Sequence, residues 1–184
     1  TSLSRVILPE SLISIGPSAF YGSSISGHLN IPNGCKHIYD DAFYKCINLT
    51  SLNLPDSIEE IGMNAFQECS SIQGNLHLPE NLKRIGSGAF AYCSMISGTL
   101  SLPKNVEYIG GTAFAGLGAI RGDLIIPHKI TEIERGTFAD CGFNGNLVLH
   151  NNIKVIGDSA FYGCSFSGEL VLPELLNKIG REAF

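Results

Sequence analysis

The sequence lacks several features that would define common protein classes. It has no tryptophan, and its charged residues amount to only 16% of the chain. No apolar run approaches the roughly 18 residues that a membrane helix needs, so we expect no membrane insertion of this segment. Lysine and arginine form no cluster and the net charge is −5, which argues against a nucleic-acid-binding protein. The hydrophobic fraction of 44% over 184 residues excludes a disordered tail and is enough for a sizeable core.

Motifs of catalysis and metal binding are also missing. The sequence contains no Cys-x-x-Cys, His-Glu-x-x-His or Gly-x-Ser-x-Gly pattern. The run Gly116–Gly122 superficially resembles a dinucleotide-binding fingerprint, but its last glycine falls one residue late. We therefore expect no enzyme activity, no cofactor and no metal. Residues 1–5 contain no apolar signal segment. Because the chain begins and ends inside a repeating pattern, we expect it to be a piece of a longer repeat protein.

What the sequence does contain is a short repeat that runs through the whole chain. A phenylalanine recurs at a nearly constant interval, preceded by alanine in every copy except one, where Thr137 precedes it. The recurring phenylalanines are Phe20, Phe43, Phe66, Phe90, Phe114, Phe138, Phe161 and Phe184. A unit this short cannot bury its own apolar side chains, so neighbouring units must stack and bury each ring between them. The repeat therefore predicts a solenoid.

One unit reads Leu-x-Leu-Pro-x-x-Leu-x-x-Ile-Gly-x-x-Ala-Phe-x-x-Cys, followed by a linker that contains glycine. The alternation in Leu-x-Leu predicts a short strand that ends at the proline. The Ile-Gly pair predicts a sharp turn, and Ala-Phe-x-x-Cys predicts one helical or 3₁₀ turn with its phenylalanine and cysteine facing inward. We expect an α/β-type solenoid of about eight turns with a short-strand parallel sheet along one face, forming one domain over residues 1–184.

The unit resembles the repeat of the BspA-like (Treponema-type) leucine-rich repeat family. Residues 54–69 match the family pattern at every hallmark position, including Leu54-Pro55, Ile61-Gly62, Ala65-Phe66 and Cys69. The resemblance implies a right-handed leucine-rich-repeat superhelix. It also implies a location at the cell surface or outside the cell, where most family members are found. Several family members are implicated in adhesion to host proteins or to other cells. The family has no shared catalytic residues. Tyr39 and Glu134 depart from the pattern at the glycine slot.

Five of the six cysteines lie three residues after a repeat phenylalanine, and Leu117 occupies this slot in another unit. A slot that also accepts leucine is typical of a small apolar side chain in a core, so we favour buried free thiols. Adjacent units are close enough for disulfides, but their side chains run parallel. Disulfides between adjacent units and a metal site remain the alternatives.

Stacking in register turns each slot of the repeat into a row along the solenoid. We expect the middle residue of Leu-x-Leu to face solvent, with polar residues in the first half of the row and β-branched residues at its end. The candidate protein-binding face consists of Asn30, Asn53, His77, Ser101, Ile125, Val148 and Val171. An exposed apolar stripe often marks an interaction site, but strand propensity, or cover by a neighbouring segment of a longer chain, is the simpler explanation of β-branched residues here.

A second row alternates in charge along the stack. Its members are Lys36, Glu59, Lys83 and Glu107. We expect ion pairs between adjacent units, which fix their register and add solubility. A charged docking face is the alternative interpretation of the row.

Two functions from different classes fit these observations. The first is a non-catalytic, surface-exposed adhesion module that uses the sheet face to bind a protein partner, such as a host extracellular or cell-surface protein. The second is a structural spacer without a ligand of its own. Neither end carries the polar cap that solenoids need. We therefore expect either further repeats in the parent protein or end-to-end self-association.

Overall fold

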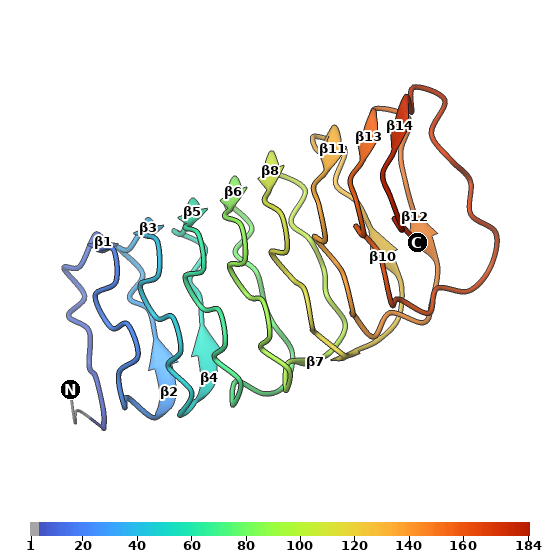
Figure 1. Cartoon of the computed structure of the whole chain (residues 1–184). Coiled ribbons are helices and arrows are strands. Elements are labelled where there is room, and N and C mark those ends of the chain that lie inside the picture. The colour runs from blue at the N-terminus through green and yellow to red at the C-terminus, as the bar shows by residue number, and fades with distance from the viewer. Residues whose placement is uncertain (1–3) are drawn as a thin grey trace.

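The computed structural model describes residues 4–184 as a coil of stacked turns, with the two ends of the chain at opposite ends of the stack (Figure 1). Residues 1–3, which belong to the segment considered above for a signal sequence, lie outside the described residues. Short parallel strands make up the secondary structure, and no helix occurs within residues 4–184. The described chain accordingly offers no helix that is long and apolar enough to cross a membrane.

The most regular strands end on the isoleucine of the Ile-Gly pair and line one edge of the coil (Figure 1). One sheet has the order β1-β3-β5-β6-β8, and a second has the order β11-β13-β14. The strands are β1 (Ser14–Ile15), β3 (His37–Ile38), β5 (Glu60–Ile61), β6 (Arg84–Ile85), β8 (Tyr108–Ile109), β11 (Glu132–Ile133), β13 (Val155–Ile156) and β14 (Lys178–Ile179). These eight strands bound seven complete turns, so the structure gives about seven turns and does not confirm eight.

The Leu-x-Leu segments pair much less regularly along the opposite edge. The strands there are β2 (Gly27–Asn30), β4 (Leu49–Asn53), β7 (Ser97–Gly98), β9 (Ala119–Ile120), β10 (Leu124–Ile125) and β12 (Leu147–Val148). They form three separate parallel pairs, β2 with β4, β7 with β9, and β10 with β12. The most extensive parallel sheet is therefore built from the isoleucine strands, and the Leu-x-Leu segments contribute only isolated pairs.

In several turns the glycine that follows the strand isoleucine is required by a close approach between turns, although Tyr39 and Glu134 occupy this slot in two turns and Gly16 has open space around it. A Cβ atom at Gly62 would lie 2.6 Å from the backbone nitrogen of Asp40 in the preceding turn, and the φ of Gly62 is not positive. A side chain at position 62 would therefore push two turns apart. The sharp turn that we expected from Ile-Gly is not the reason for this glycine.

The recurring phenylalanines form one continuous column, as the repeat predicts. All seven neighbouring ring pairs are stacked, with centroids 5.1–5.8 Å apart and interplanar angles of 3–21°. The six rings from Phe43 to Phe161 are buried, and Phe20 and Phe184 close the two ends. Two further rings, Phe143 and Phe166, stack on each other and contact the column edge-on.

The Ala-Phe-x-x-Cys segment is an extended arc of turns and not the helical turn that we expected. In the second turn, the N–H of Phe43 donates to the carbonyl of Ala65 in the next turn, whereas the N–H of Cys46 donates to Phe43 itself. Asp41 and Lys45 adopt positive φ values of 56° and 57°. Because alternate N–H groups leave for the neighbouring turn, the segment cannot close helical hydrogen bonds. The α/β class is therefore not confirmed, and the right-handed sense stays a prediction.

Candidate protein-binding face

All seven residues of the candidate face are exposed, and they follow one another along the Leu-x-Leu edge. Most of the leucines before them face the inside, as Leu124 (0% exposed) and Leu147 (8%) illustrate, whereas Leu170 in the last turn is exposed. This alternation is the period-two pattern of a strand whose one side faces the core. The two halves of the row differ in their surface chemistry.

In the first half of the face, polar side chains satisfy one another. The Nδ2 group of Asn53 donates to Oδ1 of Asn30 at 2.6 Å, and Nδ1 of His28 lies 2.8 Å from Oγ of Ser51. Both contacts join β2 to β4 on the surface. His77 and Ser101 lie in the next two turns, outside any strand. On β2 and β4, the polar side chains of the face therefore hydrogen-bond to one another.

The second half of the face is apolar. Parallel pairing of β10 with β12 places Ile125 beside Val148, with exposed fractions of 61% and 46%. Val171 occupies the same slot in the following turn and is 68% exposed, although its segment does not pair with β12. The structure therefore brings Ile125 and Val148 together directly and leaves Val171 on a separate segment. We call these three residues the apolar stripe.

Two surface cavities of about 530 and 510 Å³ lie between turns in the middle of the face. They share the segment 99–104 as a common wall, including Thr99, Ser101 and Lys104. The first is closed on its other side by residues 75–80, and the second by residues 123–128. The repeat pattern did not predict these cavities, although one signal was available: the interval between phenylalanines lengthens by a single position from Phe66 to Phe138.

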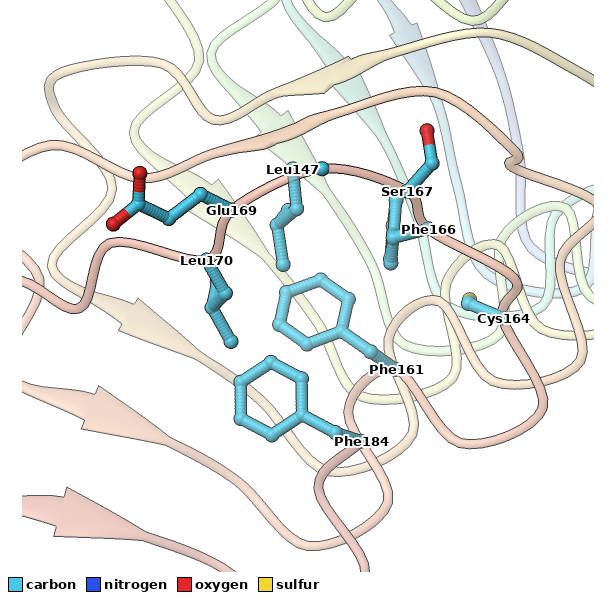
Figure 2. Close-up of a pocket in the computed structure, with 9 residues that line it drawn as sticks. Leu147, Phe161, Cys164, Phe166, Ser167, Glu169, Leu170 and Phe184 are labelled. Atoms are coloured by element: carbon cyan, nitrogen blue, oxygen red, sulfur yellow. The ribbon is translucent and has the colours of Figure 1, made fainter.

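A third hollow, of about 230 Å³, lies at the C-terminal end of the stack (Figure 2). The rings of Phe161 and Phe184 lie against it together with Leu147 and Leu170 (Figure 2). Phe184 is 49% exposed because no further turn covers its outer side in this structure. Several apolar residues at this end are exposed in the same way, including Leu172, Leu175 and Ile179.

The row of alternating charge forms ion pairs between turns, with one exception. Glu59 lies 2.7 Å from the Nζ atom of Lys83 and 3.6 Å from that of Lys36. The hydrogen bond from Lys83 lowers the pKa of Glu59, and Lys36 adds a weaker effect in the same direction. Glu107 pairs with Lys129 at 2.7 Å instead of with Lys83. The pairs are solvent-exposed, so they favour the register of the turns more than they stabilise the fold.

The cysteines are all free thiols, and those after the phenylalanines form a regular ladder. Each of the five donates from Sγ to the carbonyl of the phenylalanine in the preceding turn, as Cys93 does to Phe66 at 3.0 Å. Burial raises the pKa of Cys93 to about 12 and that of Cys164 to about 11. The thiols of Cys46, Cys69, Cys93 and Cys141 are buried, whereas that of Cys164 is only partly buried. Within residues 4–184, no three metal-ligating side chains come together as a metal site.

Comparison with known proteins identifies the repeat. Residues 1–117 and 97–184 match the BspA type leucine-rich repeat region, in six copies. No curated protein sequence matches the chain. Three solved structures of bacterial leucine-rich repeat proteins are similar to it. The Treponema pallidum leucine-rich repeat protein TpLRR is 25% identical with a TM-score of 0.70, covering 96% of this chain and 73% of its own.

The other two structures are longer than this chain. A leucine-rich cell surface protein from Faecalibacterium prausnitzii is 27% identical, with a TM-score of 0.76 over 85% of this chain and 44% of its own. A leucine-rich repeat protein from Bacteroides ovatus is 29% identical, with a TM-score of 0.77 over 92% of this chain and 43% of its own. The chain thus spans less than half the length of these two proteins.

Proposed function

Because the chain belongs to the BspA-type leucine-rich repeat family, we propose that it is a non-catalytic, surface-exposed module that binds a protein partner through its Leu-x-Leu face. Leucine-rich repeat proteins generally mediate protein interactions. The observation that carries the proposal is the apolar stripe of Ile125, Val148 and Val171, each at least 46% exposed. Aligned apolar side chains lose contact with water when a partner covers them, which favours association.

The proposal is tested by replacing the stripe with serine, as the triple variant Ile125→Ser, Val148→Ser and Val171→Ser. Binding is measured on immobilised extracellular host proteins and on whole cells. The matched control is Ile47→Ser, Met63→Ser and Met95→Ser, which removes three side chains of similar exposure from other slots of the repeat. We expect the stripe variant to lose most of its binding and the control variant to keep it. Equal binding by both variants would remove the stripe from the proposed interface.

One observation favours a second function, that of a spacer without a ligand of its own. The Asn30–Asn53 and His28–Ser51 contacts occupy polar groups that a partner would otherwise use. In a spacer, the length of the solenoid matters and its surface does not. Replacing Asn30, Asn53, Ile125, Val148 and Val171 together, with no loss of adhesion by the parent protein, would support the spacer.

We assign the chain to the cell surface or the extracellular space, and a host surface protein is the partner class that fits this location. The cell-surface description of the Faecalibacterium prausnitzii relative supports this assignment. Proteolytic shaving of intact source cells tests it. Release of peptides of this chain from unbroken cells is the expected result, and release only after lysis would contradict it.

End-to-end self-association is a further part of the proposal. Phe184 and Leu172 at one end are exposed, and Phe20 and Leu8 at the other end are only partly buried. They occupy slots whose counterparts in the interior contact a turn on each side. A second copy can therefore continue the column. Sedimentation over a hundredfold concentration range should show association that Phe184→Ser weakens, and a concentration-independent monomer would refute it.

A further inference from the structure

The Leu-x-Leu segments of the fourth and fifth turns, residues 76–78 and 100–102, belong to no strand. In their place, pairing occurs just before them, where β7 pairs with β9 and Gly74 bridges Ile96. The extra position of the longer repeat units lies in this returning segment, because the stretch from Phe66 to Leu78 is one position longer than the stretch from Phe43 to Leu54. These turns therefore pair at the corner and form no ladder of main-chain hydrogen bonds at the Leu-x-Leu segments.

Comparison with the paired turns shows which main-chain groups are left free. Between β10 and β12, the N–H groups of Leu124 and Ile126 donate to the carbonyls of Asn146 and Val148 at 2.9 and 3.1 Å. The equivalent donors one turn earlier are the N–H groups of Leu100 and Leu102. Neither makes a hydrogen bond within residues 4–184.

The acceptors that face these donors in the repeat are free as well. The carbonyls of Asp123 and Ile125 take the places of Asn146 and Val148, and they accept no hydrogen bond from the described part of the chain. Between the two segments lies the cavity of about 510 Å³. Two unpaired, extended main chains that flank a cavity present the hydrogen-bonding pattern that an added β-strand satisfies.

The residues that line this cavity, which we call the groove, indicate which side chains an added strand would carry. Leu102, Ile125 and Ile126 line it, and Ile125 connects it to the apolar stripe. Lys104 and His128 lie at the end near Pro127, and Lys104 forms no ion pair within the described residues. Asp123 lies at the opposite end, where its Oδ1 accepts the N–H of Asn146 in the next turn at 2.6 Å and its charge stays at the mouth of the groove. The groove is thus acidic where a parallel strand would begin and basic where it would end.

We propose that the groove between residues 99–102 and 123–126 binds an extended peptide segment of the partner as an added parallel strand. The segment has a basic residue at its N-terminal end, apolar residues in the middle and an acidic residue at its C-terminal end. This inference rests on the proposed function, since it specifies how part of the same face recognises a protein. It extends the interaction surface from side chains to the main chain.

A peptide from the chain itself serves as the probe. Residues 167–174 contain the Leu-Val-Leu-Pro segment flanked by Glu169 and Glu174. The Glu169→Lys peptide has the required charge order, and the Glu174→Lys peptide has the same composition in the reverse order. Titration is followed by the amide signals of the whole protein in NMR. We expect the Glu169→Lys peptide to bind at least tenfold more tightly, because opposite charges then meet at both ends.

Hydrogen exchange reports directly on the main-chain groups. Without peptide, the amides of Leu100 and Leu102 should exchange faster than those of Leu124 and Ile126, which are paired. Saturation with the Glu169→Lys peptide should slow exchange at Leu100 and Leu102 at least tenfold. The same peptide N-methylated at the residues equivalent to Leu170 and Leu172 should not protect them. This arm needs no protein variant.

Two variants locate the site. Ser101→Trp fills the groove, whereas Met95→Trp enlarges an exposed side chain in another slot of the repeat, outside the groove and the candidate face. We expect Ser101→Trp to abolish peptide binding and Met95→Trp to leave it unchanged.

Equal affinity for both peptides, or protection that avoids Leu100 and Leu102, would overturn the proposal. Protection by a neutral oligosaccharide such as maltoheptaose, without binding of either peptide, would also overturn it. The serine variant of the apolar stripe separates this inference from the proposed function. If that variant loses adhesion while the unaltered protein binds neither peptide, the proposed function stands and this groove is not part of it.

Discussion

Phe90→Ala is the substitution that tests the aromatic column most directly. Phe90 is fully buried in the middle of the column, with ring centroids 5.4 Å from Phe66 and 5.8 Å from Phe114. Losing the burial of one such side chain costs roughly 1.5–3 kcal/mol. The cavity adds to this cost, because backbone hydrogen bonds between turns prevent the two neighbouring rings from closing together. We expect a total loss of about 3–5 kcal/mol in the free energy of unfolding.

The measurement is urea unfolding followed by circular dichroism and by tyrosine fluorescence, since the chain has no tryptophan. Phe184→Ala is the matched control, because it makes the same chemical change at the end of the column. Phe184 stacks on one ring only, Phe161 at 5.5 Å, and is already 49% exposed. We expect it to cost less than half as much as Phe90→Ala.

The comparison between the two variants can refute the reasoning. A cost below about 1 kcal/mol for Phe90→Ala would mean that the turns collapse onto the cavity or that the column contributes little. Equal costs at positions 90 and 184 would mean that position in the column does not matter. Either result would contradict a fold held together by stacked rings.

Three further predictions concern thiols, backbone conformation and pH. The five buried thiols should resist a disulfide reagent in the native protein, because they are shielded from solvent and burial raises their pKa, as it does that of Cys93 to about 12. All six should react in denaturant, and fewer than six would indicate disulfides. Thr112→Gly should raise the free energy of unfolding by about 0.5–1 kcal/mol, because the strain of threonine at a φ of 55° exceeds the extra backbone entropy that glycine loses on folding. A lower urea midpoint for the variant would contradict this. Burial lowers the pKa of His150, so the folded state favours the neutral imidazole, and the free energy of unfolding should fall as the pH drops below the usual histidine pKa of 6.5. His150→Pro should make the urea midpoint depend less on pH between pH 7.5 and 5.0.

The structural basis of the pH prediction is visible in two hydrogen bonds. Nε2 of His150 lies 2.9 Å from the carbonyl of Pro127, and Nδ1 accepts the N–H of Asn152 at 3.2 Å. A carbonyl only accepts and an amide N–H only donates, so the neutral ring with its proton on Nε2 fits both. Protonation of Nδ1 removes the bond from Asn152 and places a charge beside the ring of His128, 4.8 Å away.

The periodic part of the fold was predictable from the sequence. A phenylalanine that recurs once in every short unit can be buried only by stacking, and the rings from Phe43 to Phe161 are buried as expected. Exposure of the middle residue of Leu-x-Leu followed from alternation, and Ile125 and Val148 show it clearly. These features depend on one slot at a time, which a repeated sequence reveals.

Features that depend on how two turns approach each other were not predictable. The arc around Phe43 looks like a helical turn in sequence, but its alternate N–H groups belong to the next turn. The cysteines were expected as small apolar fillers, and their donation to carbonyls of the preceding turn requires the register between turns. Glu107 pairs with Lys129 and not with Lys83, because an ion pair between turns depends on side-chain reach as well as on slot.

The two edges of the solenoid are constrained differently, and this difference bears on function. The separation from the strand isoleucine to the phenylalanine is the same in every turn, as from Ile61 to Phe66 and from Ile85 to Phe90. This part of the turn holds the column and the Ile strands, so a change of length there would disturb every neighbour. The returning part varies in length by one position, and pairing at the Leu-x-Leu edge is interrupted. Variation in the Leu-x-Leu edge therefore costs the core little, and this edge can change in sequence without loss of the fold.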